Sequence, residues 1–163
     1  QRRRNVDNKE KRNIMGKVIK MAFAALLACA MCSSCEWKDP IDEDIEGFWR
    51  LESFVTEADG EHHPCERLYF GITRMVVEVS EKDGPNDYGS FVARMEYKDG
   101  HKKVVMRDFK RRAATSDAHE DATVEQLLPF GMNATTTEFE VVVADGDNLV
   151  LRSDYATLRL KRF

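Results

Sequence analysis

The sequence predicts an all-β fold between residue 46 and the C-terminus: an up-and-down antiparallel β-barrel of about eight strands. Three observations carry this prediction. Apolar and polar residues alternate with a period of two, turn sequences separate the alternating segments, and about eight such segments can be counted. An up-and-down sheet of about eight strands can close on itself and remove its edges. An open sandwich of the same strands is the alternative.

The alternation is clear from the first segment onward. Trp49 and Leu51 share one face of this strand, whereas Arg50, Glu52 and Phe54 share the other. The expected strands are 46–56, 66–71, 74–80, 89–98, 102–109, 136–144, 148–153 and 156–162. The turn signals between them are Asp59-Gly60, Asp83-Gly84-Pro85-Asn86, Asp99-Gly100, Asp145-Gly146 and Ser153-Asp154. Asp-Gly supplies the positive φ of tight hairpins, so strands that are neighbours in sequence are expected to pair.

The connection 110–135 is too long for a hairpin and is expected to contain one short helix. Thr123-Val124-Glu125-Gln126 has the capping-box pattern that starts a helix, and Pro129 and Gly131 would end it. We expect the segment to cap one end of the barrel, with Leu127, Leu128 and Phe130 as the plug. Simple closure of the core is the alternative interpretation.

The N-terminal part is expected to be a targeting segment rather than part of the folded domain. Residues 1–14 are polar and charged and would be an upstream or mis-started leader, because Met15 begins an otherwise normal export signal. Residues 15–34 combine two lysines with an apolar run from Met21 to Met31, which is too short to span a bilayer. The expected domains are therefore the leader 1–14, the signal peptide 15–34, a polar tether 35–45 and the barrel domain 46–163.

The end of the signal, Ser33-Ser34-Cys35, resembles the lipobox of bacterial lipoproteins. This resemblance implies that Cys35 is acylated, so that the lipid anchors the exported domain to a membrane of the bacterial envelope, expected to be the outer membrane. Leu26-Leu27-Ala28-Cys29 fits the pattern locally but would leave an apolar core of only eight residues after Lys20. Cleavage by ordinary signal peptidase, giving a soluble secreted protein, is the alternative.

Charge is distributed unevenly along the chain. Eight of the 25 basic residues and two of the 29 acidic residues lie in positions 1–34, so the remaining 129 residues carry a net charge of −10. An anionic domain repels phosphate backbones, which argues against a nucleic-acid partner. Of four cysteines, Cys65 alone would remain as a thiol after cleavage and acylation, so the domain is expected to depend on its core rather than on a disulfide.

Several segments of the barrel domain carry a family resemblance. Gly47-Phe48-Trp49 resembles the Gly-x-Trp that opens the first strand of lipocalins. The C-terminal half, from Phe130-Gly131-Met132-Asn133 to Leu158-Arg159-Leu160-Lys161, resembles the lipocalin-like lipoproteins of Gram-negative gut anaerobes. The resemblance covers nearly all of residues 46–163. It implies a lipocalin-like barrel in which Gly47 and Trp49 are structural and Trp49 packs across the closed end, and Arg159 is the expected partner of that ring.

The apolar inner faces suggest a carrier of a small hydrophobic or amphipathic ligand, and no motif of an enzyme is present. The expected barrel lining is Met75, Val77, Phe91, Met95, Tyr97, Phe139 and Val141. We expect no catalytic residue, cofactor or metal site, because His62-His63-Pro64-Cys65 is read as a solvated loop. The alternative is a filled barrel that acts as an interaction or structural module of the envelope. Its outer patch would comprise Phe54, Val76, Val92 and Val150.

Overall fold

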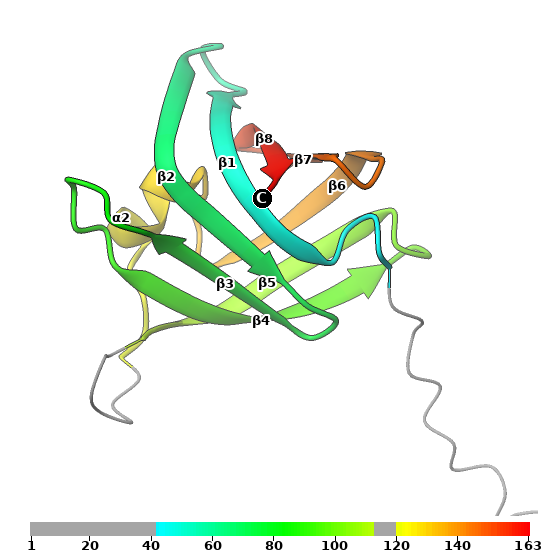
Figure 1. The fold of residues 1–163 in the computed structure, drawn as a ribbon, viewed down its shortest axis with the longest axis horizontal. Helices are drawn as coiled ribbons and strands as arrows, with labels where there is room; N and C mark the ends of the chain where they lie inside the picture. Colours follow the sequence, from blue (N-terminus) through cyan, green and yellow to red (C-terminus); the bar gives the residue numbers. More distant parts are fainter. Residues whose placement is uncertain (1–41, 113–119) are drawn as a thin grey trace, which may run out of the picture. The chain divides into compact units, whose positions relative to one another are not determined.

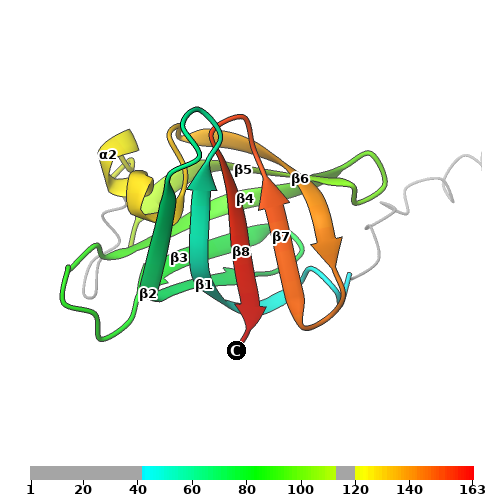
Figure 2. The same cartoon turned by 90° about the horizontal axis from the view of Figure 1, so that it is seen from above.

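The computed structural model describes residues 42–112 and 120–163, which form a closed antiparallel barrel of eight strands (Figures 1 and 2). The strands are β1 (Gly47–Thr56), β2 (His62–Ile72), β3 (Val76–Glu81), β4 (Ser90–Lys98), β5 (Lys103–Arg111), β6 (Thr136–Ala144), β7 (Asn148–Arg152) and β8 (Ala156–Arg162). Each strand pairs with the next along the chain, and β8 closes the barrel on β1. One short helix, α2 (Val124–Leu127), continues into a 3-10 turn, η2 (Leu128–Phe130), so the predicted fold class is confirmed.

The hairpins form where the sequence supplies residues that tolerate positive φ. Asp99 and Gly100 both have positive φ, at 51° and 63°, in the four-residue turn that joins Lys98 of β4 to Lys103 of β5. Gly60 and Gly146 have φ of 71° and 86° in the β1–β2 and β6–β7 turns. The predicted turn residues therefore link sequential strands, which makes the topology up-and-down.

Alternation places the apolar side chains inside. Trp49, Leu51 and Phe70 are fully buried, as are Phe139 on β6 and Leu158 on β8. All residues of the hydrophobic core lie between Ile45 and Leu160, within one compact unit that extends to Phe163. The barrel therefore contains its whole described core and meets the criterion of a domain that folds by itself.

We call the barrel end at Gly47 and Arg162 the tether end, because the described part of the chain begins there, at Asp42. Asp42–Glu46 packs across this end: Ile45 is buried, and its carbonyl oxygen accepts a hydrogen bond of 2.8 Å from Trp49 Nε1. The Asp42 carboxylate lies 2.8 Å from His101 Nδ1 in the β4–β5 turn. Residues 42–45, which we assigned to the polar tether, are thus part of the barrel's packing.

The opposite end, which we call the cap end, is covered by α2 and η2. The predicted capping box is present, since Gln126 Oε1 accepts a hydrogen bond of 3.0 Å from the Thr123 backbone N–H. Gly131 ends η2 in the left-handed region with φ 76°, where a Cβ would lie 3.1 Å from Leu158 and 3.2 Å from Phe54. Both the backbone conformation and the close packing therefore require glycine at this position.

Candidate ligand-binding cleft

Most of the residues predicted to line the barrel do face inward, but they pack into the hydrophobic core. Val77, Phe91, Met95 and Phe139 are at most 4% exposed, and Tyr97 and Val141 are partly buried against the same cluster. Met75 is a wrong prediction: it is 69% exposed. β3 begins one residue later, at Val76, so Met75 lies in the β2–β3 turn and points outward.

Side chains fill the barrel interior. The largest inward residues have no surface accessible to water, so within the described residues they leave no water-sized space around themselves; these include Trp49, Phe70, Met106, Phe130 and Phe139. The ring of Phe130 enters from the cap and meets Phe70 and Phe91 edge-on, with centroid distances of 6.4 and 6.2 Å. The expected plug is therefore confirmed for Leu127 and Phe130, which are fully buried, whereas Leu128 is 37% exposed and faces outward.

The sheet opens at the cap end between β2 and β3. β2 pairs with β3 over Leu68–Ile72, and Arg67 O accepts one further hydrogen bond from Lys82 N–H, whereas His62, His63 and Pro64 pair with β1. The β1–β2 register shifts between Leu51 and Ser53, and Arg67 adopts a left-handed φ of 58° there. This irregularity bends β2 away from β3 and leaves a cleft beside it.

The cleft has a volume of about 340 Å³ and lies between β2, the β3–β4 loop and η2. Figure 2 shows α2 beside β2, near the loop that joins β3 to β4. The lining residues are Phe54, His63, Pro64, Cys65, Glu66, Leu68, Pro85, Asn86, Tyr88 and Pro129. The accessible surface of the cleft is about equally polar and apolar, because His63, Cys65, Glu66 and Asn86 line it together with the rings.

Two groups define the chemistry of the cleft. The ring of His63 stacks on Phe54, with centroids 4.6 Å apart and an interplanar angle of 18°. Burial raises the pKa of the Cys65 thiol to about 11, against a hydrogen bond from the Phe54 backbone that lowers it, so the thiol is neutral at physiological pH. The cleft thus offers a flat aromatic wall and an uncharged sulfur, and no activated nucleophile.

The histidine cluster lies in a strand rather than a loop. His62, His63 and Pro64 are the first three residues of β2, which corrects the predicted loop. Proline fits here because its missing N–H is on the part of β2 that β3 does not pair. Within residues 42–112 and 120–163, no three His, Cys, Asp or Glu side chains come close enough to hold a metal ion.

Phe54, predicted to face outward, is only 6% exposed. The bulge in β1 and β2 interrupts the alternation just before it, so Ser53 and Phe54 are both buried. Val76 is 42% exposed, as the outer-patch interpretation requires, and Val92 and Val150 are partly exposed.

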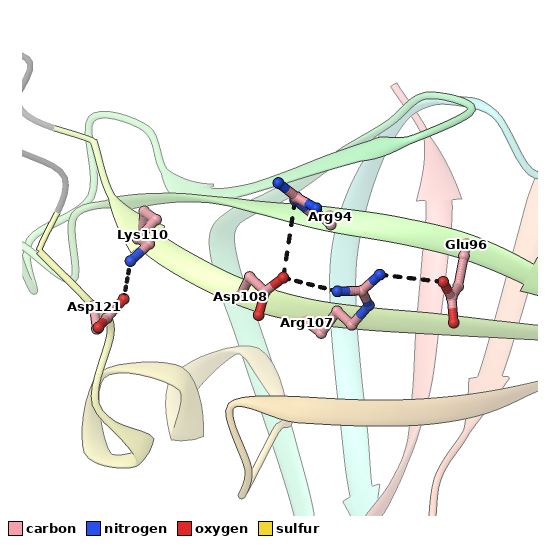
Figure 3. A network of polar contacts seen from close by, with 6 residues as sticks. All are labelled: Arg94, Glu96, Arg107, Asp108, Lys110 and Asp121. Carbon is pink, nitrogen blue, oxygen red and sulfur yellow. Dashed lines mark hydrogen bonds and ion pairs between the residues drawn. The ribbon is translucent and has the colours of Figure 1, made fainter.

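A second hollow lies on the outer face of β3, β4 and β5. It measures about 530 Å³ and its apolar part is formed by Val76, Val92 and Ala93. A polar network runs along it (Figure 3): Asp108 pairs with Arg94 and Arg107, Arg107 reaches Glu96, and Lys110 pairs with Asp121. These side chains are exposed to solvent, so the network is a charged surface and not a buried reactive centre.

At the tether end an arginine stacks on the ring of Trp49, and the prediction of which arginine does so is wrong. Arg162, not Arg159, lies over the Trp49 ring, with its guanidinium carbon 4.3 Å from the ring centroid. Arg162 also donates to the carbonyl oxygens of Glu43 at 2.7 Å and Glu46 at 3.3 Å. A Cβ on Gly47 would lie 2.3 Å from this guanidinium, which explains the glycine.

The expected lipidation site Cys35, the signal peptide and the leader lie outside the described residues. None of the helices that the structure describes is long and apolar enough to cross a membrane. No curated protein matches the chain.

Two solved structures share the fold. An uncharacterized protein from Bacteroides eggerthii is 15% identical, with a TM-score of 0.56, and the match covers 72% of this chain and 98% of that one. A lipocalin-like protein from Bacteroides uniformis is 14% identical, with a TM-score of 0.52, and the match covers 74% and 99%. The family model for a lipocalin-like domain matches residues 29–163. This chain therefore belongs to the lipocalin-like domain family.

Proposed function

We propose that this chain is an exported bacterial lipoprotein, anchored to the envelope through acylated Cys35, whose barrel binds a small amphipathic molecule in the cleft at the cap end. The observation that carries the ligand-binding part is the cleft itself: about 340 Å³ with a stacked Phe54–His63 wall. Its size and its roughly equal polar and apolar surface suit a small amphipathic ligand. The proposal includes no catalytic step.

The cleft is favoured over the barrel interior because the interior is packed. Placing a guest among Phe70, Phe91 and Phe130 would require these rings to separate, at the cost of their mutual contacts. The cleft needs no such rearrangement. Glu66 at its edge and the net charge of −10 over residues 35–163 disfavour an anionic ligand. A flat apolar body with a neutral or cationic polar group is therefore the expected chemistry.

Ligand binding can be tested on protein purified from its own host. Native mass spectrometry should detect a co-purified small molecule, and the His63→Ala variant should bind it about tenfold more weakly because one face of the aromatic wall is lost. His62→Ala is the matched control, since His62 is the preceding residue of the same strand and does not line the cleft. Equal affinity in the two variants would refute the assignment of the cleft.

Anchoring is tested separately. Mass spectrometry of the N-terminal peptide should find acyl chains on Cys35, and Cys35→Ser should move the protein out of the membrane fraction. Cys29→Ser should leave the protein in the membrane fraction. Loss of acylation in Cys29→Ser but not in Cys35→Ser would assign the anchor to the other candidate cysteine.

The packed interior favours one second function, an envelope protein-interaction module with a filled barrel. The hollow on β3, β4 and β5, with Val76 and Val92 beside the charged network, is the surface it would use. A photo-cross-linker at Val92 in cells should then capture one constant partner protein, whereas a cross-linker at Thr157 on β8 should not. A carrier without a fixed partner gives no constant product at either position.

A further inference from the structure

Exposed hydrophobic side chains gather at the tether end. Among the described residues, eight large hydrophobic side chains are exposed, and six of them lie at this end: Phe48, Met75, Val76, Val142, Val143 and Phe163. Four of these, Phe48, Met75, Val76 and Phe163, lie on β1, on the β2–β3 turn and start of β3, and after β8. Together with Tyr69 on β2 we call them the aromatic side patch. A concentration of this kind at one end is typical of a contact surface.

The patch has fixed geometry. Phe163 is 77% exposed, its N–H donates to Phe48 O at 2.9 Å, and its ring meets Tyr69 edge-on at 5.2 Å. The ring of Phe48 is 65% exposed and lies against the glycine face of Gly71, where a Cβ would come within 3.3 Å of it. These rings are thus held in place on the sheet while most of their surface faces solvent.

An amino group borders the rings, and two glutamates of the neighbouring strands are paired. Lys82 Nζ lies 5.4 Å from the Tyr69 centroid and 5.9 Å from that of Phe48. Glu52 pairs with Arg50 at 2.7 Å and Glu78 with Arg112 at 2.9 Å. Aromatic rings with one lysine at their edge match the headgroup region of a bilayer, where rings occupy the interface and the amine meets phosphate.

The length of the tether brings this end to the membrane. Six residues lie between Cys35 and Asp42, so the seven Cα–Cα steps between these two residues span at most about 25 Å. The cap end lies a full strand length further away, and the domain cannot turn that end to the bilayer as easily. An acylated Cys35 therefore keeps the tether end within reach of the lipid surface.

We propose that the aromatic side patch docks on a zwitterionic lipid surface, so that the tether end of the barrel lies against the bilayer. This inference rests on the proposed anchor at Cys35 for its biological setting. Insertion of the rings, not charge, supplies the attraction, because residues 35–163 carry a net charge of −10 and an anionic surface would repel them.

The test couples residues 35–163 through the Cys35 thiol to a maleimide phospholipid in phosphatidylcholine vesicles, on a Cys65→Ser, Trp37→Phe background. This attachment does not depend on acylation in the cell, so failure of the anchor and failure of the docking surface are read separately. Single tryptophans are introduced by Phe48→Trp, by Phe163→Trp and, as the cap-end control, by Leu128→Trp, and quenching by brominated phosphatidylcholine is measured. The buried Trp49 gives the same background in all three.

We expect quenching at positions 48 and 163 to exceed that at position 128 at least about twofold, because only the patch enters the interface. Equal quenching at the three positions, or stronger quenching at position 128, would overturn the proposal. Quenching that changes with protein density on the vesicle would assign the patch to a second copy of the chain and would also overturn it.

A second measurement needs neither tether nor new tryptophan. Untethered 35–163 with the substitution Cys35→Ser should co-sediment with phosphatidylcholine vesicles, and Phe48→Ser with Phe163→Ser should weaken this binding about fivefold or more. Leu128→Ser should leave it unchanged. The substituted side chains are exposed, so near-ultraviolet circular dichroism of Trp49 should confirm that every variant keeps its fold.

Discussion

Arg162 joins three parts of the chain at the tether end of the barrel. Its guanidinium lies over Trp49, and its N–H groups reach the carbonyl oxygens of Glu43, Glu46 and Gly146. These carbonyl groups belong to the segment that covers the barrel end and to the β6–β7 turn. One side chain therefore satisfies several backbone acceptors and covers the face of a buried indole.

Removing this contact should cost stability. We expect Arg162→Ala to lower the free energy of unfolding by about 1–2 kcal/mol, because it leaves the Glu43 and Glu46 carbonyl groups without a donor and uncovers Trp49. Urea denaturation followed by Trp49 fluorescence measures the change. Arg159→Ala is the control, since Arg159 is exposed on the same strand. A larger loss in Arg159→Ala than in Arg162→Ala would contradict this role.

Strand parity could have identified Arg162 in the sequence. Leu158 and Leu160 are buried, so position 162 continues the inward-facing set, whereas Arg159 belongs to the outward set. The partner of Trp49 had to be an inward-facing cation at the last position of β8. Its contact with backbone carbonyl groups of the segment before β1 could not be read from the pattern, because that segment has no periodicity.

At the level of elements, seven of the strands begin and end within two residues of the expected ranges, and β2 differs most. Its first half, His62-His63-Pro64, is polar and contains proline, so the sequence pattern indicated a loop. This half is nevertheless a strand, because it pairs with β1. It does not pair with β3, and a strand paired on one side only tolerates proline. The shifted register of β1 and β2 also reverses the face of Phe54. Bulges add residues without a sequence signal of their own, so the cleft that they create was not predictable.

The cap is expected to be an integral part of the core. Phe130→Ala should lower the free energy of unfolding by about 3–5 kcal/mol, because it empties the space between Phe70 and Phe91. Leu128→Ala in the neighbouring position should change it by less than about 1 kcal/mol, since Leu128 faces solvent. Thermal unfolding monitored by circular dichroism distinguishes the two. Equal small losses would mean that the cap only covers a barrel that is stable without it.

For the whole molecule, the sequence pattern predicts the number and order of the strands but not whether side chains fill the interior. Alternation and turn chemistry specify eight sequential strands, and eight is compatible with either a packed interior or a ligand cavity. Which of the two occurs depends on side-chain volume and on residues that enter from outside the sheet. Here Phe130 and Leu127 come from the long connection and Ile45 from the segment before β1, and all three are buried. Packing of this kind is a property of three-dimensional shape, which periodicity does not encode.

The pH dependence of stability should reveal the neutral buried groups of the whole barrel. Lys103 and Lys98 lower the pKa of Glu138, and Asn148 lowers that of Asp145, so the stability that these carboxylates contribute is lost as the pH falls below about 4.

Burial raises the pKa of Cys65 to about 11 and also raises that of Tyr97, where the Glu46 carboxylate adds to the effect. The unfolded chain then ionises before the folded one as the pH rises, and stability falls on the alkaline side. On a Cys35→Ser background we expect the thiol to account for a loss of about 1 kcal/mol between pH 8 and pH 10. Urea denaturation at each pH should show a smaller alkaline loss in Cys65→Ala, and an unchanged loss would mean that the thiol ionises as freely in the folded barrel as in the unfolded chain.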